Sequence, residues 1–443
     1  MSLNAALPAR VRTVLVNRWL GWVALAPLVV LIFLSAFQLN WVRSHPDSTS
    51  LLVYSKALST ERTLNDYDEF YLVGRLYREG DIRRAYDVNK LLVDQKRFIG
   101  AESFLPWAYP PQFTALMTVL PIFGIFASFI LFVGGSLAFF VFVLARFGRE
   151  YAGASIVAVY PAMLLNGRLG QNGFLTAGFI GLFLLLYSKK RQGAGVPLGL
   201  LGMKPHLGLA LGLLTLISGY WRTILIAFIV LVATLVLATL MLGVDIWPAF
   251  LAGARQSSAF LQTAGYSLYR MSSVYGSLRS FGMSASASFV IHAIVALLLI
   301  GLMVFAYVRS WDNKHLLSVV VLANMFISPY NHDYDYVCLA FAISLLLPEL
   351  LDRIRLGELA LFYVFVWIGT GSGLLQHLRA VLFEHSLDHP RGSSLDLSFQ
   401  AIGILAAAIL VAIVIRRTPL SASDEPATLD TTRSGTEALE IPQ

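Results

Sequence analysis

Apolar segments separated by short polar stretches recur along nearly the whole chain. Several of them approach or exceed the roughly 20 residues that a helix needs to cross a bilayer. A helix satisfies every backbone hydrogen bond within one such segment, so the pattern predicts an all-α polytopic membrane protein. The predicted membrane segments are residues 19–41, 126–145, 151–165, 172–188, 223–243, 284–308, 315–329, 334–348, 358–375 and 399–415.

A further apolar segment, residues 194–218, interrupts this simple alternation. Basic residues flank it at Arg191 and Arg222, although a single crossing cannot begin and end on the same side. Lys204 and Pro205 lie near its middle, and proline tends to break a helix because it lacks the backbone donor. Either two short helices form a re-entrant hairpin, or the segment crosses once and one flanking arginine is not cytoplasmic. With two short helices counted separately, the bundle has about 12 transmembrane or re-entrant helices.

Composition agrees with a membrane protein. Only 13% of the 443 residues are charged and 57% are hydrophobic. The mean hydropathy is +0.69. A net charge of +7 would suggest nucleic acid in a soluble protein, but basic cytoplasmic loops account for it here, so we expect no nucleic-acid partner. The single cysteine, Cys338, excludes a disulfide within the chain.

Clusters of basic residues orient the segments. Arg10 and Arg12 precede the first one, which is too long for a signal-peptide core and lacks a clean cleavage site, so we expect an uncleaved helix with a cytoplasmic N-terminus. The positive-inside rule then places residues 42–111 in a large first non-cytoplasmic loop. We expect residues 1–417 to form a single membrane domain and residues 418–443 to form a disordered cytoplasmic tail.

The loop 42–111 contains an amphipathic pattern. Phe70, Val73 and Leu76 recur at helical spacing, which predicts a helix lying along the membrane interface, and Gly80 marks its end.

Two carboxylates, Asp66 and Asp68, stand at the start of this predicted helix. Asp66 is placed either to cap the helix or to accept the proton of a hydroxyl that attacks a lipid-linked substrate. The two acids together would alternatively hold a divalent cation. No dense cluster of Asp, Glu and His elsewhere in the sequence supports a dedicated metal cage, so we expect no metal site.

Three short polar connectors fall on the same face as this loop, at residues 108–113, 166–173 and 327–336. Each alone would serve as an ordinary turn, but together they predict the rim of an active site. Arg168 and His332 are the side chains expected to hold an anionic group such as phosphate. The outer segment 245–280 either contacts the acceptor or covers the bundle.

Lys204 is unusual because a lysine within a membrane segment is costly and marks a functional site by default. The alternatives are that it pairs with a buried carboxylate such as Asp335, or that it extends to the interface. The candidate substrate-binding residues are Asp68, Tyr71, Tyr109, Arg168, Gln171, Asn172, Lys204, His206, Tyr330, His332 and Asp335.

Five motifs lie between about residues 60 and 345: DYDEFYLVGRLYREGDIRRAYD, YPPQF, GQNG, GMKPHLGL and SPYNHDYDY. In this order they resemble glycosyltransferase family 87, which includes polyprenol-phosphate-mannose-dependent α-1,2-mannosyltransferases. The resemblance implies a GT-C fold with its catalytic acid in the first non-cytoplasmic loop. The loop pattern of the family matches Asp66, Tyr67, Phe70 and Tyr71, so the resemblance assigns the catalytic base to Asp66. The last motif departs from many relatives, where a Trp precedes an acid and a His, so His332 is not matched securely.

The resemblance implies a membrane hexosyltransferase that uses no cofactor. It would move a sugar, with mannose expected, from a polyprenyl-phosphate donor to a hydroxyl of a lipid or glycan acceptor with inversion. The reaction would take place in the bilayer of the plasma or inner membrane, on its non-cytoplasmic face. The alternatives are a transporter or flippase for a lipid-linked sugar, and an oligosaccharide ligase or polymerase. No P-loop and no clear dinucleotide-binding motif is present in the sequence.

Overall fold

The computed structural model describes residues 7–44, 64–100, 105–260, 268–383 and 397–419. Within these ranges every regular element is a helix, and the extended backbone pairs only at an isolated bridge between Met271 and His332. The prediction of an all-α protein is therefore confirmed. The predicted tail lies outside the described residues from 420 onward.

The helices follow one another along the chain in three groups. The first group is α1 (Ala9–Leu15), α2 (Arg18–Ser44), α3 (Asp66–Arg78), η1 (Ile82–Tyr86), α4 (Val88–Ile99), α5 (Pro111–Met117), η2 (Leu120–Ile122), α6 (Ile125–Phe129), η3 (Ile130–Gly134) and α7 (Gly135–Gly148). The second is η4 (Arg149–Tyr151), α8 (Ala152–Ala158), α9 (Tyr160–Leu169), α10 (Gly173–Ser188), η5 (Gln192–Ala194), α11 (Gly195–Leu200), η6 (Leu201–Met203), η7 (Pro205–Gly208), α12 (Leu209–Ile217) and α13 (Trp221–Leu242). The third is α14 (Ile246–Phe260), η8 (Leu268–Arg270), α15 (Val274–Ser280), α16 (Ala285–Val308), α17 (Asn313–Phe326), η9 (Asp333–Cys338), α18 (Leu339–Leu351), α19 (Leu356–Phe383) and α20 (Gln400–Ile415).

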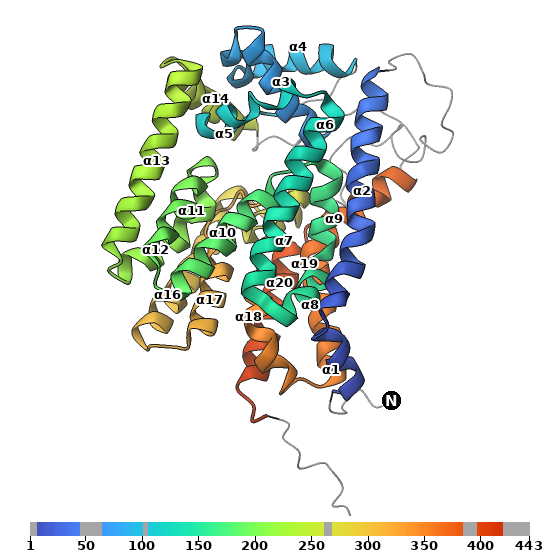
Figure 1. The fold of residues 1–443 in the computed structure, drawn as a ribbon, viewed down its shortest axis with the longest axis vertical. Coiled ribbons are helices and arrows are strands. Elements are labelled where there is room, and N and C mark those ends of the chain that lie inside the picture. Colours follow the sequence, from blue (N-terminus) through green and yellow to red (C-terminus); the bar gives the residue numbers. More distant parts are fainter. Residues whose placement is uncertain (1–6, 45–63, 101–104, 261–267, 384–396, 420–443) are drawn as a thin grey trace, which may run out of the picture.

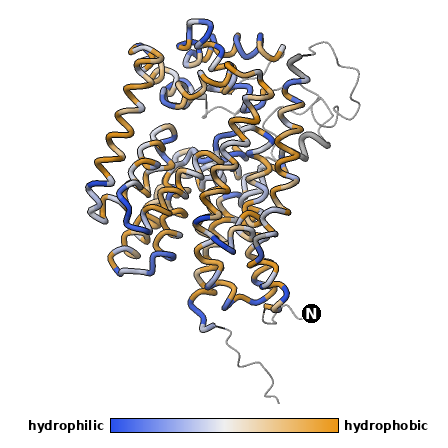
Figure 2. The backbone as a smooth tube through the Cα atoms, in the orientation of Figure 1, coloured by the Kyte–Doolittle hydropathy of each residue, from blue (hydrophilic) through white to orange (hydrophobic). Residues whose placement is uncertain are grey.

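Six helical stretches in the described ranges are long and apolar enough to cross a membrane. They are Trp19–Trp41, Ile125–Ala158, Trp221–Leu242, Ala285–Val308, Asp333–Leu351 and Leu356–Gln376. Hydrophobic residues predominate along the middle of these helices, while hydrophilic residues lie at many of their ends and in the connections (Figure 2). The chain is therefore a multi-pass membrane protein by the length and composition of its helices.

Three other predicted segments form helices shorter than the roughly 20 residues that a crossing needs. Residues 172–188, 315–329 and 399–415 correspond to α10, α17 and α20, which have 16, 14 and 16 residues. The predicted segments 126–145 and 151–165 fall in the long stretch Ile125–Ala158 and in α9 after it. Arg149, at a φ of 51°, ends α7 within that stretch. The total of about 12 stays a prediction.

Helices α3, α4 and α5 lie across one end of the bundle, and α2 runs toward that end from the N-terminal end of the molecule (Figure 1). The prediction of a helix after residue 65 is confirmed, since α3 begins at Asp66 and ends at Arg78. Gly80 then reverses the chain at a φ of 85°, a conformation that favours glycine. Residues 45–63, in the first part of the predicted loop 42–111, lie outside the described ranges.

The apolar segment 194–218 is broken at Lys204, as its proline predicts. Short helices α11 and η6 precede the break, and η7 and α12 follow it. Gly195 and Gly199 let α11 approach α13 closely, because a Cβ at either glycine would collide with the α13 backbone. The structure therefore places Lys204 at a non-helical position between two short helices.

Buried apolar side chains run through the bundle as one core cluster. Cys338 belongs to this cluster, is fully buried and lies with its Sγ 3.3 Å from Sδ of Met325. Its role is therefore that of a small apolar side chain.

Candidate active site

The start of α3 is held by a capping box. Asn65 is the N-cap and accepts a hydrogen bond from the Tyr67 amide, while the carboxylate of Asp68 accepts one from the Asn65 amide at 3.0 Å. The interpretation of Asp66 as the cap is therefore wrong, because the preceding residue performs that function. Asp68, predicted to bind substrate, is fully buried and stabilises the helix start.

The carboxylate of Asp66 is bound by side chains from distant parts of the chain. It accepts two hydrogen bonds from Arg270, with distances of 2.8 Å to Nη2 and 3.3 Å to Nη1. A third comes from Nε2 of Gln171 at 2.9 Å. Burial alone would raise the pKa of Asp66, but the guanidinium of Arg270, these hydrogen bonds and nearby His332 lower it. Asp66 is therefore an ionised, buried and rigidly oriented carboxylate.

The connector between α9 and α10 brings Gln171 to this position. Gly170 ends α9 at a φ of 70° and lies against Tyr67, where a Cβ would collide with the tyrosine. The side chain of Asn65 donates a hydrogen bond to the carbonyl of Arg168 at 3.2 Å. The connector and the start of α3 are thus joined directly, which fixes Gln171 beside the carboxylate.

A second ion pair lies at the break in segment 194–218. Nζ of Lys204 is 2.6 Å from Oδ1 of Asp335, and the two side chains are 6% and 0% exposed. Nζ also lies 3.4 Å from Oδ1 of Asn172. The predicted alternative that Lys204 pairs with Asp335 therefore describes the structure. Such a buried pair is costly to break, because either partner alone would be an uncompensated charge.

The ring of Tyr334 connects the two ion pairs. Its centroid lies 4.6 Å from Nζ of Lys204 and 5.9 Å from Cζ of Arg270. His332 stacks on the same ring at a centroid distance of 5.3 Å. Two cations from distant parts of the chain are thus gathered around one aromatic side chain, next to Asp66.

The structure brings most of the predicted residues together around Asp66 and Lys204. Those that take part in these contacts or adjoin them are Tyr109, Gln171, Asn172, Lys204, His332 and Asp335. The hydroxyl of Tyr109 donates to Oε1 of Gln171 at 3.2 Å, which extends the network toward α5.

Four predicted residues are placed differently. The ring of Tyr71 stacks on Phe98, and its hydroxyl faces the carbonyl of Phe123. Tyr330 is 46% exposed. Arg168 lies near Asp68 and joins α3 through its backbone carbonyl. His206 is two residues beyond Lys204, with its Nε2 buried and without a hydrogen-bond partner among the described residues.

Arg270, the main partner of Asp66, is not among the residues predicted from the sequence. It ends η8, within the segment 245–280 that is expected either to contact the acceptor or to cover the bundle. Its only sequence signal is that it is a charged residue in a serine- and aromatic-rich segment. Among the described residues, no group of three His, Cys, Asp or Glu side chains is arranged to hold a metal ion.

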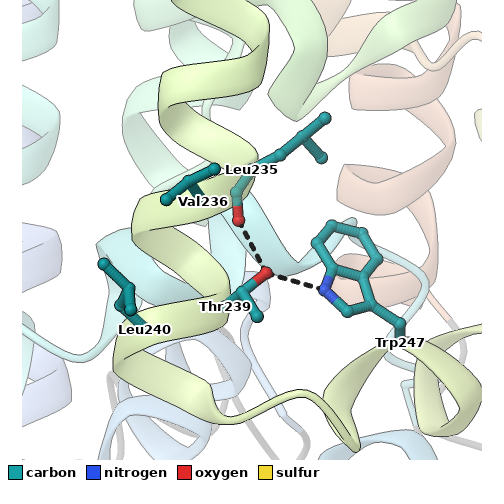
Figure 3. Close-up of a pocket in the computed structure, with 5 residues that line it drawn as sticks. All are labelled: Leu235, Val236, Thr239, Leu240 and Trp247. Atoms are coloured by element: carbon teal, nitrogen blue, oxygen red, sulfur yellow. Dashed lines mark hydrogen bonds between the residues drawn. The ribbon is translucent and has the colours of Figure 1, made fainter.

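Two cavities lie away from this cluster. One of about 480 Å³ opens on α13, beside the hydrogen bond of 2.9 Å from Nε1 of Trp247 to Oγ1 of Thr239 (Figure 3). Its other lining residues are apolar, as expected for a groove on a helix whose outer face is hydrophobic. The other, of about 410 Å³, lies between η1, α4 and α14 and is lined mainly by charged and polar side chains. Neither is lined by Asp66, Lys204 or Arg270.

Comparison with known proteins shows the family of this chain. The model of glycosyltransferase family 87 matches residues 107–329, which is half of the chain and includes Gln171, Lys204 and Arg270. Asp66 precedes the matched region and Asp335 follows it. No curated protein and no solved structure matched the chain. On the strength of the family match, the chain belongs to glycosyltransferase family 87, and it is a membrane glycosyltransferase.

Proposed function

We propose that this glycosyltransferase moves a hexosyl group, with mannose as the expected sugar, from a polyprenyl-phosphate donor to a hydroxyl of a lipid or glycan acceptor. The observation that carries the proposal is the buried carboxylate of Asp66, held ionised by Arg270 and Gln171 beside the second cation, Lys204. A glycosyl transfer to a hydroxyl needs a base, and a phosphate leaving group needs positive charge. Both requirements are met within one cluster.

The reaction proceeds as a single displacement. Asp66 accepts the proton of the acceptor hydroxyl as the oxygen forms its bond to the anomeric carbon. The bond from that carbon to the donor phosphate breaks, and the phosphate oxygen keeps the electron pair. Lys204 and Arg270 stabilise the charge on the departing polyprenyl phosphate, and the configuration at the anomeric carbon inverts. The proton on Asp66 then returns to water.

Both cations are already paired with carboxylates in the structure. Arg270 is shared with Asp66, so binding of a donor phosphate would draw the guanidinium toward the phosphate and release the base. This exchange would favour proton transfer only when donor is bound. A transporter would instead place its ionisable groups along the spans. Here Asp66 and Arg270 belong to α3 and η8, outside the candidate membrane spans, and of the two ion pairs only Asp335 lies within one.

The placement in the cell is part of the proposal. We propose a GT-C bundle of about 12 transmembrane or re-entrant helices in the plasma or inner membrane. The end of the bundle covered by α3, α4 and α5 would face away from the cytoplasm. Polyprenyl-phosphate sugars serve as donors on that face because nucleotide sugars are absent there.

The proposal is tested with purified protein in lipid, given radiolabelled polyprenyl-phosphate mannose and extracted membrane lipids. Asp66→Asn should lower the transfer rate by about 10²–10⁴-fold, the usual contribution of a general base. The matched control Asp81→Asn, at the exposed turn after α3, should keep the wild-type rate. Transfer that survives in a folded Asp66→Asn variant would refute the assignment of the base. Wild-type protein that transfers no sugar from any polyprenyl-phosphate donor would refute the proposed function.

A further inference from the structure

Glu69 is a second buried carboxyl group beside the proposed base. Glu69 is 5% exposed, and its Oε1 has no hydrogen-bond partner among the described residues. A buried polar atom without a partner costs roughly 1–3 kcal/mol, so a protein keeps one where something else compensates. A ligand that supplies the missing hydrogen bond would provide that compensation.

Glu69 lies on the same face of α3 as Asp66. Residues three apart lie on one face of a helix, about 5–6 Å apart at their Cβ atoms. The negative charge of Asp66 acts on Glu69, and a charge on Glu69 would in turn act on the hydroxyl of Tyr109. Glu69 is therefore close to both the proposed base and Tyr109, whose hydroxyl binds Gln171.

The two carboxyl groups of α3 differ in protonation. Burial, followed by the charge of Asp66, raises the pKa of Glu69 well above its ordinary value, whereas the pKa of Asp66 is lowered. The raised pKa favours the protonated form of Glu69 beside ionised Asp66, and a protonated carboxyl group both donates and accepts hydrogen bonds. Neutral Glu69 cannot compete with Asp66 as a base.

Other polar atoms in the cluster are also buried and unpaired among the described residues, including Nδ2 of Asn172 and Nε2 of His206. Both residues lie next to Lys204, at one end of the site. The phosphate of the donor can accept hydrogen bonds from these two atoms beside Lys204, but it carries no hydroxyl group for Glu69. A sugar hydroxyl group both donates and accepts, so it matches the carboxyl group of Glu69.

We propose that Glu69 binds a hydroxyl group of the transferred sugar and thereby helps to select which sugar is transferred. This inference rests on the proposed function, because it requires a glycosyl donor in the site. The side chain is a specificity residue, and it exchanges no proton in the reaction.

The test removes the carboxyl group of Glu69 and the hydroxyl group of the sugar, first separately and then together. Wild-type protein, Glu69→Leu, Glu69→Gln and the control Glu79→Gln are assayed for kcat/KM with polyprenyl-phosphate mannose and with each of its monodeoxy analogues. Glu79 lies just after α3, pairs with Arg75 on the surface and is matched in chemistry. Folding of each variant is checked by its thermal transition.

For wild type, we expect one deoxy position to lower kcat/KM by about 10–100-fold, because it leaves Glu69 unpaired. Glu69→Leu should lose a similar factor with the parent donor and should show no further loss at that same position. Glu69→Gln, which keeps a donor and an acceptor, should retain most of the parent rate. Glu79→Gln should behave as wild type throughout.

Two results would overturn the inference, and they are distinguishable. If Glu69→Leu keeps the full wild-type penalty at every deoxy position, Glu69 contacts no sugar hydroxyl, while transfer by wild type leaves the proposed function intact. If wild type transfers no sugar from any polyprenyl-phosphate donor, the proposed function fails and the inference fails with it.

Discussion

Replacing Lys204 by methionine would separate its structural role from its chemical role. The variant keeps the length of the side chain but leaves Asp335 charged, fully buried and without the cation 2.6 Å away. The remaining contact to that carboxylate is the amide of His332 at 3.3 Å. Breaking a buried pair in this way typically costs about 3–5 kcal/mol, because an uncompensated charge stays behind.

This cost translates into a measurable thermal shift. With an unfolding entropy of about 2.1 cal/mol/K per residue, a chain of this length has roughly 0.9 kcal/mol/K, so a loss of about 4 kcal/mol lowers Tm by roughly 4 °C. The double variant Lys204→Met/Asp335→Asn removes the orphaned charge and should recover most of that shift. The control Lys189→Met, on the exposed end of α10, should leave Tm unchanged.

The double variant tests whether Lys204 contributes to sugar transfer separately from its contribution to stability. It should be nearly as stable as wild type but transfer sugar about 10²–10³-fold more slowly, because the donor phosphate has lost one of its two cations. Tm is followed by tryptophan fluorescence in detergent, and transfer is assayed in lipid. A single variant as stable as wild type, or a double variant that transfers sugar at the wild-type rate, would refute this reasoning.

Two further predictions concern the groups around α3. Asp68→Ala should lower the free energy of unfolding by about 1 kcal/mol while transfer continues, because the Asp68 carboxylate accepts the hydrogen bond of the Asn65 amide in the capping box. Denaturation in urea and the transfer assay check this, and loss of transfer in stable protein would contradict it. Arg270→Gln should move the acid limb of the rate profile to higher pH, because only the smaller effects of Gln171 and His332 then oppose the rise in the pKa of Asp66 caused by burial. The control Arg279→Gln should leave the acid limb unchanged, and an unchanged acid limb in Arg270→Gln would contradict the prediction.

The parts of the structure that the sequence predicts well depend on local chemistry. The apolar spacing in 66–78 and the glycine after it correctly predict α3, because both signals lie within the helix itself. The break at Lys204 is equally local, since Pro205 disrupts the helix wherever the segment is placed. The pairing of Lys204 with Asp335 is predictable as an alternative because a buried charge needs a partner of opposite charge, and few acidic residues lie in or beside the apolar segments.

Other features could not be predicted from the sequence. Asn65 and Asp66 are both good caps, and only the backbone geometry decides that Asn65 performs this function. Arg270 pairs with an acid 204 residues away, and no periodicity or motif carries that information. Glu69 looks like one more charge in a polar helix, and its burial depends on packing against the rest of the bundle.

The contact between Asp66 and Arg270 also has a consequence for biosynthesis. The two residues are 204 positions apart, and ribosomes add about 5–20 residues per second, so the arginine is synthesised roughly 10–40 s after the aspartate. Asp335 follows still later. During that interval Asp66 has no guanidinium to offset its burial, so α3 cannot pack in its final position. A nascent chain that stops before residue 270 would therefore hold an incomplete site, and membranes would contain no partly synthesised but active enzyme.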